Sequence, residues 1–303
     1  MNQPSGTAKH RFAQMLNEFV NRETELGNFK KVLGSPDLAI YAVWGDGGVG
    51  KSLFMAKMVH EVAQRNLRKA ELVWSETNNH DYLAVMRKLR DDLGVDTFKP
   101  FTDLVNFFTV PQYELKITVS SNAPIEVARG ARIEGSQVGD IAGIIVKDVM
   151  LTDPRADLQV PKAERRKRLT DCFITCMAAA LASEPAVVFF DAVEKMSEET
   201  EAWLRDELLE SACAGRLGKA KFVLCGRKEP HFDRSWDYAA AVDQLCPLSQ
   251  QHIVAYLEKR GVGPEGREQL AQMLLAVTGG NTLQLATHVK NYLKIQARQD
   301  KAA

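Results

Sequence analysis

Residues 45–52 read Gly-Asp-Gly-Gly-Val-Gly-Lys-Ser and fit the pattern G-x-x-x-x-G-K-[ST]. The apolar run at 38–44 predicts a buried strand before this stretch, and residues 53–64, which contain no Gly or Pro, predict a helix after it. A strand, a glycine-rich loop and a helix in this order form the setting in which the pattern binds phosphate. The stretch therefore predicts a P-loop.

The composition of this loop suits a nucleoside triphosphate with magnesium. Glycines let the backbone N–H groups point inward at phosphate oxygens, and the N-terminus of the following helix adds partial positive charge. Lys51 is expected to contact the β- and γ-phosphates, and Ser52 to bind Mg²⁺. The alternative is a chance glycine turn, which the flanking strand and helix patterns disfavour. The residues expected to contact the nucleotide here are Gly45, Asp46, Gly47, Gly48, Val49, Gly50, Lys51, Ser52 and Leu53.

The bulk composition is typical of a globular protein. The chain has 303 residues, of which 45% are hydrophobic and 26% charged, and its net charge is zero, so we do not expect a general polyanion binder. No run approaches the roughly 18 apolar residues of a membrane helix, and the N-terminus lacks a signal core, so we expect a cytoplasmic protein. Cys172 and Cys176 have no further Cys or His near them and are interpreted as buried thiols rather than metal ligands.

Strand and helix patterns alternate through most of the chain, and only helical patterns follow Pro247. This order predicts an α/β fold, a P-loop NTPase domain over 1–246 with a parallel sheet covered by helices, and a small helical lid domain over 247–303. The further strands are expected at 70–75, 186–191, 221–225 and 241–245. The further helices are expected at 12–33 with a break at Asn21-Arg22, and at 82–93, 100–108, 163–182, 198–214, 250–260, 265–277 and 283–296.

A β-rich insertion is expected at about 112–150. Its residues alternate between apolar and polar, and glycines interrupt the pattern, which predicts one or two hairpins. The strand candidates are 113–119, 125–128, 131–134 and 141–149.

Three further residues complete the predicted site. Asp191 ends a fully apolar strand pattern and is expected to order the magnesium from a strand neighbouring the P-loop; its alternative role is a helix or turn cap. Glu194 is the nearest candidate for the base that activates water, and a solvated acid of the first helical turn is an equally open interpretation. Arg227 follows the strand at 221–225 and is expected to contact the γ-phosphate; a surface cation is its alternative.

A basic run at 162–168 is the one candidate for nucleic-acid contact. It contains Lys162, Arg165, Arg166, Lys167 and Arg168. Because no aromatic residues interleave these cations, a solvated helix face is the favoured interpretation.

Taken in order, the motifs resemble the signal-transduction ATPases with numerous domains (STAND), close to the NACHT and NB-ARC groups of the AAA-like P-loop class. The resemblance implies ATP and Mg²⁺ as ligands, an adenine covered by the first motif with Arg22, and a lid that closes over the nucleotide. Besides the P-loop, it is carried by residues 19–26, 187–195, 222–230, 245–257 and 278–285.

The chain departs from this family at several positions. Thr282 stands where the lid usually has the proline that contacts adenine, Lys195 replaces the last acid after Asp191, and Ala192 occupies the place of a second acid. Asn21 replaces a glycine of the first motif. These replacements predict weaker nucleotide retention and slow hydrolysis. The given sequence ends at residue 303 without the repeat sensor or effector domain typical of the family, so, if the sequence is complete, sensing and output are expected to belong to partners or to the insertion.

The sequence therefore predicts an ATP-binding signalling switch with low ATPase turnover, coupled to a protein partner or to self-association. One alternative is a DNA-associated AAA-type ATPase, such as a loader or transposition helper. Another is a scaffold that holds nucleotide without hydrolysing it.

Overall fold

The computed structural model describes residues 19–74, 81–109, 114–119, 146–152, 160–182, 184–230 and 236–299. The chain divides into two compact units, one formed by Met1–Phe98 with Phe173–Ala303 and the other by Lys99–Cys172. The predicted domain boundary between residues 246 and 247 remains a prediction.

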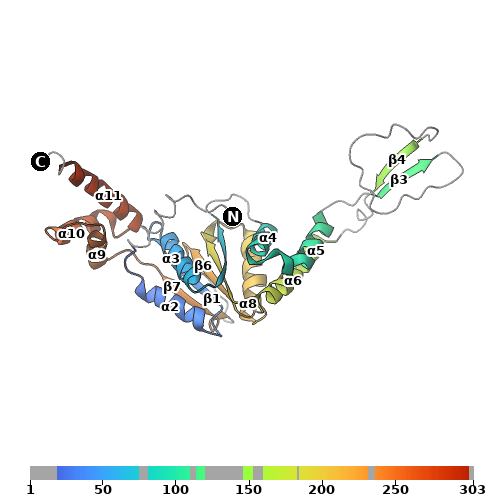
Figure 1. Ribbon diagram of the computed structural model, residues 1–303, viewed down its shortest axis with the longest axis horizontal. Helices are drawn as coiled ribbons and strands as arrows, with labels where there is room; N and C mark the ends of the chain where they lie inside the picture. The colour runs from blue at the N-terminus through green and yellow to red at the C-terminus, as the bar shows by residue number, and fades with distance from the viewer. Residues whose placement is uncertain are drawn as a thin grey trace. The chain divides into compact units, whose positions relative to one another are not determined.

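The larger unit contains a parallel five-stranded sheet in the order β2-β5-β6-β1-β7 (Figure 1). This is the α/β P-loop NTPase fold that the sequence predicts. Its strands are β1 (Ile40–Trp44), β2 (Arg68–Val73), β5 (Ala186–Asp191), β6 (Ala220–Gly226) and β7 (Ala240–Gln244). Its helices before β7 are α2 (Glu23–Gly34), α3 (Lys51–Gln64), α4 (Tyr82–Leu93), the 3₁₀ turn η1 (Val95–Phe98), part of α6 (Lys162–Leu181), the 3₁₀ turn η2 (Val193–Lys195), α7 (Glu198–Trp203), the π-helical turn η3 (Leu204–Leu209) and α8 (Glu210–Cys213).

Local sequence signals explain several element boundaries. The Asp81 side chain accepts a hydrogen bond of 2.7 Å from the Ala84 N–H, which caps α4, and Gly94 follows its last residue. The predicted helix at 82–93 is thus confirmed at both ends. The helix predicted at 198–214 is instead interrupted by the π-helical turn η3, a change that helical periodicity alone does not signal.

The two faces of the sheet are both buried, as parallel sheets require. Helices α2 and α3 cover one face (Figure 1). On the other face the stacked rings of Phe190 and Phe222 lie 6.4 Å apart, and Trp74 lies 5.5 Å from Phe190. The core on the α2–α3 face includes Phe29, Val32, Tyr41, Val43, Phe54, Met58, Val187, Phe189, Val223 and Cys225.

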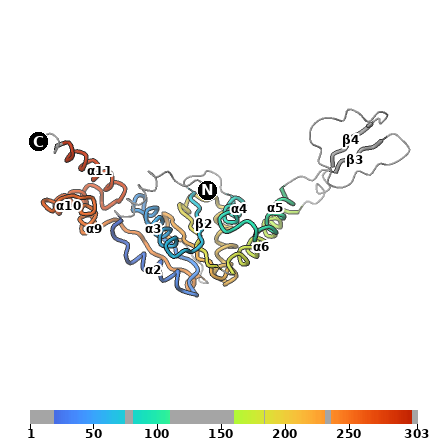
Figure 2. The backbone as a smooth tube through the Cα atoms, viewed as in Figure 1, coloured from blue at the N-terminus to red at the C-terminus, as the bar shows by residue number. Residues whose placement is uncertain are grey.

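The strand order brings several loops to one edge of the sheet. In a parallel sheet the carboxyl ends of the strands lie at the same edge. Ligands bind at this edge, at the point where the strand order reverses. Strand β1 lies between β6 and β7, although the chain first continues to β2 at the far edge, a path that Figure 2 traces. The strand that ends at Asp191 was expected to lie next to β1. This expectation is wrong, because β6 lies between the two strands.

The C-terminal helices are α9 (Gln250–Lys259), α10 (Arg267–Thr278) and α11 (Thr282–Gln299). They pack around a small apolar core of their own that includes Ile253, Leu257, Ala271, Leu285 and Val289. The three predicted C-terminal helices are confirmed.

The smaller unit contains α5 (Lys99–Thr109), the first half of α6 and an antiparallel pair, β3 (Glu114–Val119) with β4 (Val146–Thr152). The β character expected at 112–150 is confirmed for these two strands. The candidates at 125–128 and 131–134, and the first residues of 141–149, lie outside the described residues. Among the helices described, none has the length and apolarity needed to cross a membrane.

Candidate nucleotide site

The P-loop joins the end of β1 to the start of α3. Gly48 and Gly50 have φ angles of +83° and +97°, which favour glycine. A Cβ on Gly45 would lie 2.5 Å from the Leu245 carbonyl oxygen, so this position also excludes a larger residue. The loop residues therefore fold into the turn that the motif predicts.

Lys51 begins α3 and reaches back over the loop. Its ammonium group donates to the carbonyl oxygens of Gly45 and Asp46 at 2.6 and 2.8 Å. Burial lowers the pKa of Lys51, and Arg227 lowers it further, whereas the carboxylates of Glu194 and Asp191 raise it. These electrostatic effects show that the four residues predicted to act on the phosphates lie in one neighbourhood.

Asp191 lies at the carboxyl end of β5 and is 6% exposed. Burial raises the pKa of this carboxyl, and hydrogen bonds from the Ser52 side chain and the Ala192 N–H oppose the rise. Magnesium in P-loop proteins is bound by a P-loop Ser or Thr and an acid of this kind. Because the Ser52 hydroxyl lies close enough to Asp191 to lower the pKa of its carboxyl, these two residues would hold a shared Mg²⁺ ion.

Glu194 and Arg227 are paired with each other beside the P-loop. The Arg227 Nε lies 3.2 Å from the Glu194 carboxylate, and a Cβ on Gly47 would lie 3.9 Å from the guanidinium carbon. Between Asp191 and Glu194, Ala192 adopts a left-handed conformation with φ +58°, which strains a residue other than glycine. Glu194 follows this strained turn and pairs with Arg227.

An apolar pocket of about 160 Å³ opens beside the P-loop. Phe19 and Val20 from the N-terminal segment line it together with the loop and the C-terminal helices. Its few polar groups suit a flat, largely apolar ring such as a nucleobase. The lining residues are Phe19, Val20, Arg22, Val49, Gly50, Leu53, Leu248, Tyr256, Thr282, Leu285 and Ala286.

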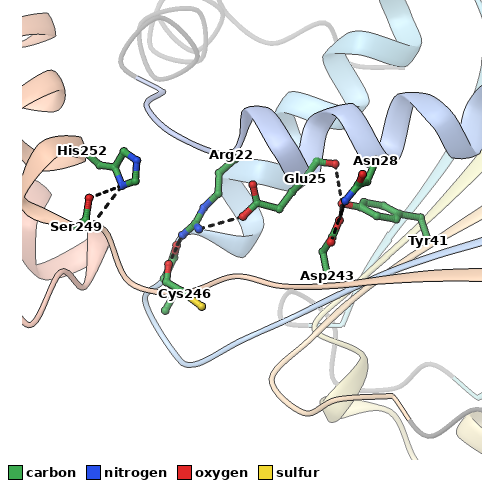
Figure 3. Close-up of polar contacts among 9 residues, drawn as sticks. Arg22, Glu25, Asn28, Tyr41, Asp243, Cys246, Ser249 and His252 are labelled. Carbon is green, nitrogen blue, oxygen red and sulfur yellow. Dashed lines mark hydrogen bonds and ion pairs between the residues drawn. The ribbon is translucent and has the colours of Figure 1, made fainter.

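Arg22 joins the N-terminal segment to the loop and to the residues after β7. Its guanidinium donates to the Cys246 carbonyl oxygen and to the Glu25 carboxylate at 3.3 Å (Figure 3). It also donates to the Val49 carbonyl oxygen at 3.3 Å. The residue is 5% exposed and left-handed, with φ +85°. Arg22 therefore lines the pocket while its guanidinium is hydrogen-bonded within the protein.

A second polar cluster near Arg22 connects α2 to β7 by hydrogen bonds. Asn28 donates to both carboxylate oxygens of Asp243 at 3.1 Å (Figure 3). The Tyr41 hydroxyl lies 2.6 Å from Asp243 and 2.8 Å from the Glu25 carbonyl oxygen, and its one proton serves either acceptor. Burial and the Asp243 carboxylate raise the pKa of Tyr41, so the hydroxyl stays protonated.

Several residues of the pocket carried no sequence signal of their own. Phe19, Leu248, Tyr256 and Leu285 lie within motifs that were recognised, yet nothing in those patterns says which side chains face a ligand. Thr282, which was predicted to contact the nucleotide, does line the pocket.

The basic run at 162–168 begins α6, away from the P-loop in sequence. Arg168 is paired with Glu164 at 2.8 Å, and the Arg165 guanidinium lies 5.7 Å from the centre of the Phe108 ring. These two cations are thus engaged within the smaller unit.

Comparison with known proteins adds likenesses of fold. No family profile and no curated protein matches the chain. A STAND protein with a tetratricopeptide repeat sensor from Pyrococcus horikoshii is 15% identical over 88% of this chain and 29% of its own length, with a TM-score of 0.44. Cdc6p from Pyrobaculum aerophilum is 14% identical over 99% of this chain and 64% of its own, with a TM-score of 0.48. Replication initiator DnaA, solved with AMPPCP and single-stranded DNA, is 10% identical over 95% and 69%, with a TM-score of 0.45.

This chain therefore spans less than two thirds of the first two of these proteins. Its P-loop NTPase fold rests on its own loop and strand order.

Proposed function

We propose that this chain binds ATP with Mg²⁺ and acts as a switch whose nucleotide state controls contact with a protein partner or with further copies of itself. The observation that carries the proposal is the grouping of Lys51, Asp191 and Arg227 around the P-loop, beside an apolar pocket suited to a nucleobase. The preference for adenine rests on the family resemblance.

In this proposal the pocket and the loop divide the nucleotide between them. The base enters the pocket beside Val49 and Leu53, and the phosphates follow the loop N–H groups toward Lys51. Ser52 and Asp191 would hold Mg²⁺, which neutralises charge on the β- and γ-phosphate oxygens. Lys51 exchanges its loop carbonyls for phosphate oxygens, and Arg227 contacts the γ-phosphate.

The switch follows from the γ-phosphate, which ATP has and ADP lacks. A ligand shifts a conformational equilibrium only by its differential contacts with the two states, and here the γ-phosphate contacts to Lys51 and Arg227 provide them. Loss of those contacts after hydrolysis would favour the other conformation.

Hydrolysis is expected to be slow. Water attacks the γ-phosphorus, the bond to the β–γ bridging oxygen breaks, and Glu194 is the candidate acceptor for the water's proton. The ion pair with Arg227 and the strained turn at Ala192 support low turnover, because Glu194 must leave that pair before it can orient a water.

The test is Mg²⁺-dependent ATP turnover as a function of protein concentration, with Lys51→Ala and Glu194→Gln as controls. Turnover that rises with concentration and is lost in Lys51→Ala supports a switch whose sites are completed by self-association. Tight binding with no turnover selects a nucleotide-holding scaffold, and no binding at all refutes the proposal.

A further inference from the structure

The turn between α10 and α11, residues 279–281, and the first two residues of α11 are hydrogen-bonded directly to the P-loop backbone. The Asn281 side-chain amide donates to the Gly47 carbonyl oxygen at 2.8 Å. The Thr282 hydroxyl donates to the Gly48 carbonyl oxygen, and the Leu283 N–H donates to the same oxygen at 3.1 Å. We call this set of contacts the P-loop clasp.

The clasp is closely packed on both of its sides. A Cβ on Gly48 would lie 2.5 Å from the Asn281 side-chain oxygen, and one on Gly50 would lie 3.2 Å from the Thr282 hydroxyl. On the opposite side, the Leu248 N–H donates to the Gly280 carbonyl oxygen at 2.9 Å. The turn is thus wedged between the loop and residue 248.

The clasp determines where two backbone N–H groups point. In a trans peptide the C=O of one residue and the N–H of the next point in opposite directions. No peptide bond among the described residues is cis. By binding the carbonyls of Gly47 and Gly48, the turn therefore aims the N–H groups of Gly48 and Val49 to the other side of the loop. In a P-loop, groups at these positions donate to phosphate.

We propose that Asn281 and Thr282 are positioning residues that orient the P-loop for phosphate and thereby couple phosphate binding to the docking of α11. The inference rests on the proposed function. Coupling between two sites is reciprocal, so whatever strengthens the clasp also retains nucleotide, and bound nucleotide in turn steadies α11. Thr282 would thus contribute a hydrogen bond that a proline at this position could not make.

Two substitutions remove the side-chain contacts of the clasp and leave the helix intact, while the Leu283 N–H bond to Gly48 remains. Asn281 also caps α11, since its side-chain oxygen accepts from the Gln284 N–H at 3.2 Å, and Asn281→Ser keeps a good capping group while losing the reach to Gly47. Thr282→Val keeps the branched shape and removes the donor. Thr287→Val is the matched control, because the Thr287 hydroxyl donates within α11, to the Leu283 carbonyl oxygen at 3.0 Å.

The first readout is the release rate of a fluorescent ADP analogue in the presence of Mg²⁺, measured by stopped flow. Each clasp variant is expected to release the analogue about fivefold faster than the wild type, and the double variant about 25-fold faster, as for hydrogen bonds worth ~1 kcal/mol each. Thr287→Val is expected to stay within twofold of the wild type.

The second readout separates coupling from simple loosening of the helix. Hydrogen exchange in α11 is expected to slow when Mg-ADP binds the wild type and Thr287→Val, and not to change in the double clasp variant. Release rates within twofold of the wild type, or unchanged nucleotide-dependent protection in the double variant, would overturn the coupling. Failure of the wild type to bind the analogue would instead overturn the proposed function on which it rests.

Discussion

Replacing Arg22 by alanine is expected to cost about 2–4 kcal/mol of unfolding free energy. The change removes a 5%-exposed guanidinium that donates to the carbonyls of Val49 and Cys246 and pairs with Glu25. Hydrogen bonds to charged groups contribute about 1.5–3 kcal/mol each, and water entering the space would restore part of the loss. The magnitude is large because the Glu25 side chain is itself only 15% exposed and would be left without its cation.

The backbone at residue 22 supplies a second, independent expectation. With φ at +85°, alanine is strained there and glycine is not, so Arg22→Gly should be about 1 kcal/mol more stable than Arg22→Ala. Lys88→Ala is the control, because it removes an exposed helical pair with Asp92 worth only about 0.3–0.5 kcal/mol.

Urea unfolding followed by tryptophan fluorescence is the suitable assay for this series. The chain has four tryptophans, and all of them lie in the unit that contains the site. The signal therefore reports that unit and not residues 99–172. An Arg22→Ala loss no larger than that of Lys88→Ala would refute the role assigned to the guanidinium. Equal stability of the Ala and Gly variants would refute the strain argument.

Three other substitutions test separate parts of the site. Burial raises the pKa of Asp191, so the folded state binds the proton of this carboxyl more readily than the unfolded chain does. The folded state therefore loses stability as the pH rises from the pKa of the unfolded chain through the raised pKa of the folded state. Asp191→Asn should therefore raise the urea midpoint at pH 7 more than at pH 4 while Mg-ATP binding is lost; a lower midpoint at pH 7 would contradict this. Gly280→Ala would place a Cβ 2.2 Å from the Leu248 carbonyl oxygen, whereas Gly279→Ala meets nothing within 4 Å. Thermal melts should show Gly280→Ala as the less stable by roughly 2 kcal/mol, and equal melts would disprove the close packing. Tyr41→Phe should cost about 1–2 kcal/mol in urea, since Asp243 loses a buried donor, and an unchanged midpoint would argue against that bond.

The sequence predicted the local elements of this site well because short-range chemistry defines them. Asp81 and Gly94 mark both ends of α4, and the apolar run that ends at Asp191 appears as β5 over the predicted residues. The break expected at Asn21-Arg22 corresponds to two consecutive left-handed residues before α2.

Long-range arrangement was not available from one sequence. The placement of β6 between β1 and the strand of Asp191 depends on which strands pair, and each strand alone reads as a buried apolar run. The ion pair between Glu194 and Arg227 joins two loops, and the clasp joins Asn281 to a glycine more than two hundred positions earlier. No periodic pattern encodes such contacts.

The most direct test of the account is calorimetric titration of the wild type and Lys51→Ala with ATP, each with and without Mg²⁺. The account predicts Mg²⁺-dependent binding at one site per chain in the wild type and a loss of at least about 100-fold in affinity in Lys51→Ala, because the lysine is the main cation at the phosphates. Equal affinity in both proteins, or no binding to a folded wild type, would contradict the claim that this P-loop is a nucleotide site.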